Sequence, residues 1–334
     1  MIVRSQLRGA LSMLAIHLVV GACLGCKANT TPVVDPVLSL LPKQTHTVAA
    51  FDLQGIKQSP LWQALRFDHR LPDQKVLADI KARAGFDPLT DIRRIVVAFP
   101  EHARASGQFA VVIYGAKLDE KRLVAYARDQ AKLAGIEITQ EEHAGQRLWV
   151  QRNQHEQRAG FFLGDHTFVM GGGDWAFKMA ELLAAKGQDS AAHVLELANL
   201  CRRTGVDHAA WLASLVPSAT RTQLAADPRF QAASSVGRVA ITLNVADGLK
   251  LTARAELSEA QAATTLAGQL ERYAVEFRQS PQVLLLGLGP WLQGLDVVAK
   301  GPKVQVDVHL PPDQTQALAE RVAGLLSLSR DWQR

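Results

Sequence analysis

The sequence predicts an α+β fold in which antiparallel sheets carry helices on one face. From residue 45 onwards, runs in which apolar and polar residues alternate are interleaved with segments of helical periodicity. Successive strand-like runs are joined by short turns, which favours antiparallel pairing between neighbours in the sequence. Hydrophobic residues make up 48% and charged residues 21% of the 334 residues, a balance typical of a globular chain with a sizeable core.

The first half of the body opens with a strand over Thr45–Leu53 and two short helices. The first helix, Ser59–Leu65, has serine at the N-cap and Pro60 at the first helical position, where no N–H is needed. The second, Gln74–Ala84, ends at Gly85, where a glycine C-cap is expected. Six further strands and two further helices are predicted: strands Arg93–Phe99, Gln108–Gly115, Ile136–Thr139, Arg147–Gln151, Gly160–Leu163 and Thr167–Gly171, and helices Asp119–Ala134 and Asp174–Ala185.

The second half repeats this outline. His208–Leu212 follows the pattern of His46–Phe51, and Val236–Val245 follows that of Ile92–Phe99. A hairpin around Gly301-Pro302 is matched with Ile136–Val150. The remaining predicted elements are strand Leu249–Glu256, a helix from a Ser258/Gln261 capping box to Phe277, hairpin strands Leu295–Val298 and Lys303–Leu310, and helix Asp313–Ser327.

This outline predicts a tandem duplication of a strand-helix-hairpin unit. Residues 45–190 would form the first α+β repeat and residues 191–334 the second. The alternative is that two unrelated α+β halves look alike when they are reduced to strands and helices.

Residues 1–22 have the parts of a secretory signal peptide. Arg4 and Arg8 precede the apolar stretch Leu11–Ala22, and the segment contains no acidic residue. The stretch is shorter than the roughly 20 apolar residues that a membrane-spanning helix needs. The alternatives are a signal peptide that is cut without lipidation and an N-terminal anchor that is left uncut.

A cysteine stands where cleavage of the signal is expected. Val20-Gly21-Ala22-Cys23 resembles the bacterial lipobox, in which an aliphatic and two small residues precede an acylated cysteine. A second register ends at Cys26 but places Cys23 at the aliphatic position, so Cys23 is favoured and Cys26 is the alternative. The resemblance implies a diacylglyceryl group and an N-acyl chain on that cysteine, and each buried methylene stabilises membrane binding by about 0.8 kcal/mol.

The resemblance also implies an address in the cell envelope. Asp follows neither cysteine, which by similarity to the enterobacterial sorting rule favours the outer membrane, with the body facing the periplasm. Residues 23–44 would form a lipidated tether, and Pro32, Pro36 and Pro42 predict that it is extended rather than helical. Cys23 and Cys26 also form a C-x-x-C, but a redox site needs a packed helix N-terminus to lower a thiol pKa.

The body is similar to the exported, duplicated α+β lipoproteins of unknown function of Gram-negative bacteria. The similarity is carried by Leu41-Pro42 before a strand, Ser59-Pro60-Leu61 after it, and Gly85-Phe86-Asp87-Pro88 leading to Asp91-Ile92. No activity comes with this resemblance.

Charge and cysteine content exclude several classes of protein. The formal charge of +5 includes Arg4 and Arg8 of the leader, so the mature body carries +3, too weak and dispersed an excess for a nucleic-acid binder. Cys201 is the one cysteine of the body, so no disulfide framework is expected. A disulfide between Cys26 and Cys201 is the alternative.

No segment matches a catalytic, cofactor-binding or metal-binding motif, so we assign no such residue and no cofactor. His143, His155 and His166 lie in consecutive hairpin-like segments and are the best metal candidates, although surface turns explain them better. Gly171-Gly172-Gly173-Asp174 stands where phosphate loops occur, but a turn with Asp174 as N-cap explains it better. Val283–Leu292 is the most apolar internal stretch, and core is favoured over a lip that touches lipid or a partner.

The sequence therefore favours a membrane-anchored envelope lipoprotein with a non-enzymatic binding or structural role. Its partners would be membrane lipid, through the acylated cysteine, and an envelope protein or apolar ligand. One alternative is an envelope hydrolase or transferase whose site has no recognisable motif. Another is a lipid-handling periplasmic protein.

Overall fold

The computed structural model describes residues 34–65, 74–115, 117–153, 156–205, 208–227, 230–280, 283 and 293–331. These residues form helices and antiparallel strands, which confirms the predicted α+β class. The chain divides into two compact units. The first unit contains residues 34–54 and 74–198 of the described chain, and the second contains residues 55–65 and 199–331.

The first unit follows the predicted order of strands and adds several short helices. Helices α3 (Leu53–Lys57) and α11 (Leu195–Thr204) contain the points where the chain passes from one unit to the other. The other elements of the first unit are α2 (Val34–Leu40), β1 (Thr45–Asp52), α6 (Gln74–Asp79), the π-helical turn η1 (Ile80–Ala84), α7 (Pro88–Asp91), β2 (Ile92–Pro100), α8 (Ala103–Ser106), β3 (Phe109–Gly115), α9 (Glu120–Leu133), β4 (Ile138–His143), β5 (Gln146–Arg152), β6 (Gln157–Leu163), β7 (Thr167–Gly172), α10 (Trp175–Ala184) and η2 (Ala191–His193).

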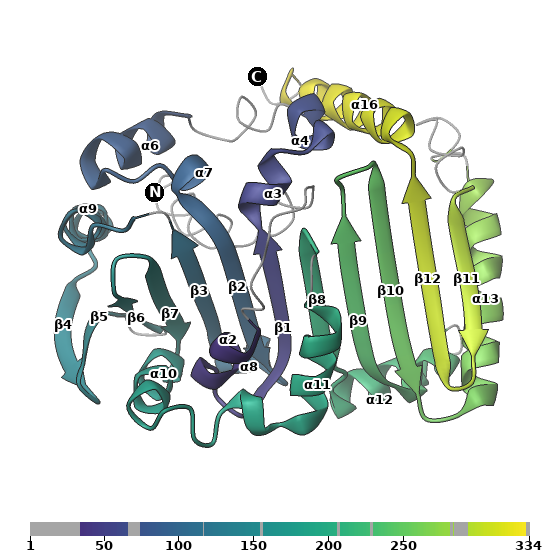
Figure 1. Ribbon diagram of the computed structural model, residues 1–334, viewed down its shortest axis with the longest axis horizontal. Helices are drawn as coiled ribbons and strands as arrows, with labels where there is room; N and C mark the ends of the chain where they lie inside the picture. The colour runs from purple at the N-terminus through teal and green to yellow at the C-terminus, as the bar shows by residue number, and fades with distance from the viewer. Residues whose placement is uncertain are drawn as a thin grey trace. The chain divides into compact units, whose positions relative to one another are not determined.

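The strands of the first unit lie in the order β1-β2-β3-β7-β6-β5-β4, and every neighbouring pair is antiparallel (Figure 1). Helix α10 packs on β7, β6 and β3. Trp175, Met179 and Phe161 are fully buried there, together with Leu148 of β5. These large apolar side chains come from the inward positions of strands and helix, as the alternation in the sequence predicts.

Helix α2 contradicts the prediction that residues 23–44 are extended throughout. Pro36 is the third residue of α2, within the first turn, where a proline removes no intrahelical hydrogen bond. Val37 and Leu38 are buried, and the helix packs on α10 and η2. Residues 34–40 therefore already belong to the packed body, and any tether that follows an acylated Cys23 is shorter than predicted.

The predicted helix ends and starts are confirmed at some positions and wrong at others. Ser59 caps α4, since its Oγ accepts a hydrogen bond from the Trp62 N–H at 3.0 Å, and Gly85 ends η1 with a left-handed φ of 64°. Asp174 does stand at the N-cap of α10, but its side chain makes no cap hydrogen bond and accepts one from Gln108 Nε2 instead. The capping box at Ser258 is wrong because α13 begins one residue later, with Glu259 at its N-cap.

The described strands of the second unit pair antiparallel in the order β11-β12-β10-β9-β8 (Figure 1). Helix α13 packs on β10, β12 and β11, where Ala263, Leu266 and Ala267 contact Leu257 and Val304. The elements are α4 (Pro60–Leu65), β8 (Ala210–Leu215), α12 (Ser218–Ala226), η3 (Gln231–Ser235), β9 (Val236–Asn244), β10 (Leu249–Leu257), α13 (Ala260–Arg278), β11 (Leu295–Lys300), β12 (Lys303–Leu310) and α16 (Pro312–Asp331).

The two units share one topology. In each, three strands pair in succession, a helix follows, and a later hairpin returns so that its last strand pairs with the third strand. In the first unit that hairpin is β6–β7, and in the second it is β11–β12. The predicted match of residues 295–310 with Ile136–Val150 is therefore wrong, because β4 and β5 are an addition to the first unit.

Candidate functional site

One face of the second unit's sheet is polar while the other packs against α13. The residues of β9, β10, β12 and β11 alternate between the two faces. Val239, Ala255, Val304 and Val306 pack with α13. The residues on the opposite side define what we call the polar face: Arg238, Ala240, Thr242, Asn244, Lys250, Thr252, Arg254, Glu256, Asp296, Val298, Lys300, Lys303, Gln305, Asp307 and His309.

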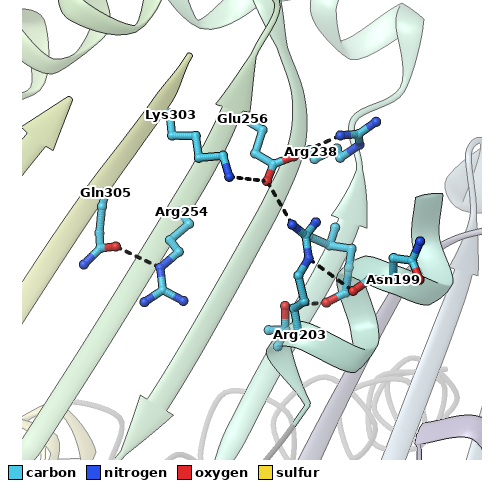
Figure 2. A network of polar contacts seen from close by, with 9 residues as sticks. Asn199, Arg203, Arg238, Arg254, Glu256, Lys303 and Gln305 are labelled. Atoms are coloured by element: carbon cyan, nitrogen blue, oxygen red, sulfur yellow. Dashed lines mark hydrogen bonds and ion pairs between the residues drawn. The ribbon is translucent and has the colours of Figure 1, made fainter. Parts of the chain in front are cut away.

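Glu256 of β10 is the centre of this face (Figure 2). Its Oε2 accepts a hydrogen bond from Arg238 Nη1 of β9 at 2.9 Å. Its Oε1 lies 3.5 Å from Lys303 Nζ of β12 and 3.6 Å from Nη1 of Arg203, which the end of α11 contributes. Register places Arg238 and Lys303 directly opposite Glu256 on the two neighbouring strands. The sheet itself thus brings three cations to one carboxylate.

The electrostatic state of Glu256 follows from this arrangement. Burial alone would raise the pKa of its carboxyl, because the side chain is only 20% exposed. The hydrogen bond from Arg238 and the charges of Arg203 and Lys303 outweigh burial and hold the pKa below its usual value. Glu256 is therefore ionised at neutral pH and cancels only one of the three positive charges around it.

A second group of polar contacts continues along the same face (Figure 2). Arg254 Nε donates to Gln305 Oε1 at 2.8 Å, and Gln305 Nε2 and Thr252 Oγ1 each donate to a carboxylate oxygen of Asp307 at 2.5 Å. Burial by itself would raise the pKa of the Asp307 carboxyl. These hydrogen bonds and the charges of Lys250 and Arg254 outweigh burial and hold that pKa below its usual value. The Arg254 side chain is exposed.

The polar face carries a positive charge. With Arg203 it holds six basic and three acidic side chains, a net charge of +3 with His309 neutral. Lys250, Arg254, Lys300 and Lys303 are exposed. Such a face attracts anionic groups, and exposed guanidinium and ammonium groups are the side chains that bind phosphate and carboxylate.

The sequence contained a signal for this face that our prediction did not use. Strand β10 reads LKLTARAEL and β12 reads KVQVDVHL, each with polar or charged residues at every second position. That alternation predicts one solvated sheet face. It does not predict which charges meet, because Glu256 and Lys303 are brought together by a register between strands far apart in the sequence.

The predicted lipidation sites, Cys23 and Cys26, lie outside the described residues, as does His155. His143 belongs to β4, and its Nε2 lies 2.8 Å from Glu181 Oε1, with its ring edge-on to Phe177. His166 lies in the turn between β6 and β7. Among the described residues, no three potential ligands gather to hold a metal ion. A polar contact with Glu181 thus explains His143, and a turn position explains His166.

The glycine-rich segment 171–173 is explained by packing. A Cβ on Gly171 would lie 2.5 Å from the backbone N of Ala176 in α10, and a Cβ on Gly172 would collide with the carbonyl oxygen of Gly107. Gly173 has a φ of +62°, and its N–H donates to Gln157 O at 2.9 Å. Close backbone approach explains Gly171 and Gly172, and a turn explains Gly173. A phosphate-binding role is therefore not needed to account for the three glycines.

Cys201 is a free, fully buried thiol, and Cys26, its partner in the alternative disulfide, lies outside the described residues. Burial raises the pKa of the Cys201 thiol to about 12, despite the opposing charge of Arg202. A protonated, buried thiol is chemically inert. Of the apolar stretch Val283–Leu292, the structure describes Val283 alone, which is 1% exposed.

Comparison with known proteins assigns no family to this chain. No family model and no curated protein matches the sequence. Among solved structures, crystal form I of TP0453 aligns with a TM-score of 0.42 and 12% identity, covering 90% of this chain and 99% of that one. Crystal form IV of TP0453 aligns with a TM-score of 0.44 and 14% identity, covering 87% and 96%. In the described part of the chain, no helix has the length and apolar character to cross a membrane.

Proposed function

We propose that this chain is a lipid-anchored protein of the bacterial cell envelope with a non-enzymatic binding role. The acyl group would be on Cys23, with Cys26 as the alternative, and the anchor would lie in the outer membrane. The observation that carries the proposal is the lipobox-type run Val20-Gly21-Ala22-Cys23 directly after an apolar signal core. Several acyl chains on one cysteine anchor a protein durably.

The start of the packed body bears on how the anchor would act. Eleven residue steps separate Cys23 from Val34, the first residue of α2. A chain spans at most about 3.6 Å per residue, so α2 would stay within about 40 Å of the bilayer whatever path the segment takes. Lipidation would thus keep the body close to lipid headgroups.

We expect substitution of the acylated cysteine to release the protein from the membrane. Cys23→Ala should abolish incorporation of radiolabelled palmitate and move the protein out of the membrane fraction, because no acyl acceptor remains. Cys26→Ala is the matched control and should remain labelled and membrane-bound. The reverse pattern would assign Cys26, and labelling of both single variants but not the double variant would show that either cysteine serves. Palmitate-free, soluble wild type would contradict the anchor.

We further propose that the polar face of the second unit binds anionic lipid headgroups. This proposal is supported by the net charge of +3 on the polar face and by the exposure of Lys250, Arg254, Lys300 and Lys303. A basic surface residue gains about 1 kcal/mol near an anionic membrane. A basic face on a lipid-anchored body would orient that body on the membrane as well as help to hold it there.

This finer proposal predicts charge-dependent vesicle binding. The double variant Cys23→Ala, Cys26→Ala, purified without acyl chains, should float with vesicles containing phosphatidylglycerol and not with pure phosphatidylcholine. Adding Lys250→Glu and Arg254→Glu should weaken that binding by at least about tenfold, because two attractive charges become repulsive. High salt should weaken it too.

The control reverses two exposed lysines of α9, Lys121→Glu and Lys132→Glu, which changes the net charge equally. That variant should retain binding if the polar face is the contact surface. An equal loss of vesicle binding in both variants would show that only the net charge matters and would contradict binding through the polar face. Equal binding to neutral vesicles would contradict headgroup recognition.

A further inference from the structure

Strand β11 of the second unit has the features of an edge prepared for a partner. Among the described residues its one strand neighbour is β12, so its other side ends the sheet. On the polar face, β11 presents Asp296, Val298 and Lys300, and the Val298 side chain is 49% exposed. Val298 is therefore an exposed apolar residue in the middle of this edge strand, between side chains of opposite charge. An exposed sheet edge is a template for pairing with another chain.

The backbone of β11 has a defined outward side. His309 N–H donates to Gly294 O at 3.2 Å, so the peptide group of Gly294 points toward β12. Peptide groups alternate along an antiparallel strand. Those of Asp296, Val298 and Lys300 therefore also face β12, and those of Val297 and Ala299 face away from the sheet.

A second copy of the same strand fits this edge. If two β11 strands pair antiparallel with Val298 opposite Val298, then Val297 of each copy lies opposite Ala299 of the other, and their outward peptide groups can bond. In the same register Asp296 of each copy lies directly opposite Lys300 of the other, on the same sheet face. Directly opposite unlike charges and apolar pairs both stabilise strand pairing.

Helix α13 lies against the same strand. It packs on the apolar side of β11 (Figure 1). A twofold axis midway between the two Val298 residues would place the two α13 helices on the same face of the joined sheet. Three large apolar side chains of α13 are exposed: Tyr273, Val275 and Phe277, at 38%, 49% and 56%.

We propose that two copies of this chain associate through antiparallel pairing of their β11 strands, with the twofold axis midway between the two Val298 residues. The interface is isologous, so each copy gives and receives the same Asp296–Lys300 contact. The second units of both copies then share one continuous sheet and one enlarged polar face.

Crosslinking of the purified, unacylated full-length chain tests this register directly. In a non-hydrogen-bonded antiparallel pair the Cα atoms are about 4.5 Å apart, a distance that permits a disulfide. Val298→Cys, in the Cys23→Ala, Cys26→Ala background, should convert most of the protein to a disulfide-linked dimer under oxidation. Lys300→Cys should not, because its partner is Asp296. Lys132→Cys on α9 is the control and measures the background of crosslinks that form by random collision.

Exchanging the charges at positions 296 and 300 distinguishes loss of the proposed interface from misfolding of the variant. Asp296→Lys should remove most of the Val298→Cys crosslink by placing two lysines opposite each other, and Asp296→Lys with Lys300→Asp should restore it. Failure of Val298→Cys to exceed the Lys132→Cys background, equal self-crosslinking at position 300, or no rescue by the exchange would overturn the proposal. These outcomes are independent of lipidation and of vesicle binding, which are measured separately.

Discussion

Replacing Trp175 with alanine is expected to destabilise the first unit by about 3–5 kcal/mol, the cost of truncating a large aromatic side chain in a core. Trp175 is the first residue of α10, is fully buried, and belongs to the layer between α10 and the sheet. The cavity would be lined by residues of strands and helix that cannot collapse freely. Chemical denaturation followed by circular dichroism gives the free energy, and hydrogen exchange of β3, β6 and β7 amides shows that the loss is in the first unit.

Two controls define what the Trp175 side chain contributes. Its indole N–H has no hydrogen-bond acceptor among the described residues, so Trp175→Phe loses volume but no hydrogen bond and should cost clearly less than Trp175→Ala. Leu133→Ala, at a side chain that is 80% exposed, should change stability by less than about 0.5 kcal/mol. If Trp175→Ala were as mild as Leu133→Ala, α10 would not be packed as described.

Gly171→Ala is expected to cost about 1–3 kcal/mol by overpacking the contact between β7 and α10. The added Cβ would lie 2.5 Å from the backbone N of Ala176 and 3.0 Å from the backbone carbon of Trp175. Because both neighbours are backbone atoms, the helix must move away from the strand. Equilibrium unfolding and the protection of α10 amides from hydrogen exchange measure this displacement.

The matched control for Gly171 is Gly237, which also lies in a strand. A Cβ on Gly237 would meet its nearest atom, the carbonyl oxygen of Glu256, at 3.9 Å, an ordinary contact. Gly237→Ala should therefore be neutral or slightly stabilising, since alanine loses less backbone freedom than glycine on folding. Equal costs at both positions would show that close approach of α10 is not the reason for Gly171.

Sequence periodicity predicted the strands well because each sheet buries one face. The runs in β2, β3 and β10 alternate or are β-branched, and their bounds lie close to those predicted. Helices α12 and α11 were missed. Helix α12 has no buried residue and so no apolar face to recognise. Helix α11 does bury Leu197, Ala198, Leu200 and Cys201, but its first residue, Leu195, is 69% exposed. Helix α2 was missed because prolines were taken to exclude a helix, whereas a first-turn proline is tolerated.

The candidate site was less predictable than the fold. The cluster around Glu256 depends on cross-strand register and on a cation from α11, and neither follows from local sequence. The lipidation signal is the opposite case, since it is a linear motif read from Val20 to Cys23 without any tertiary structure. The proposed anchor and the proposed binding face therefore rest on separate kinds of observation and can fail separately.

Mass spectrometry of the N-terminal peptide of the mature protein, isolated from membranes of its host, tests the lipid anchor most directly. We expect the peptide to begin at Cys23 and to carry the mass of a diacylglyceryl group and an amide-linked acyl chain; a peptide beginning at Cys26 with that mass would assign the alternative cysteine. A mature chain that retains Met1, or that begins at a residue without any acyl mass, would contradict the anchor on which the proposed function depends.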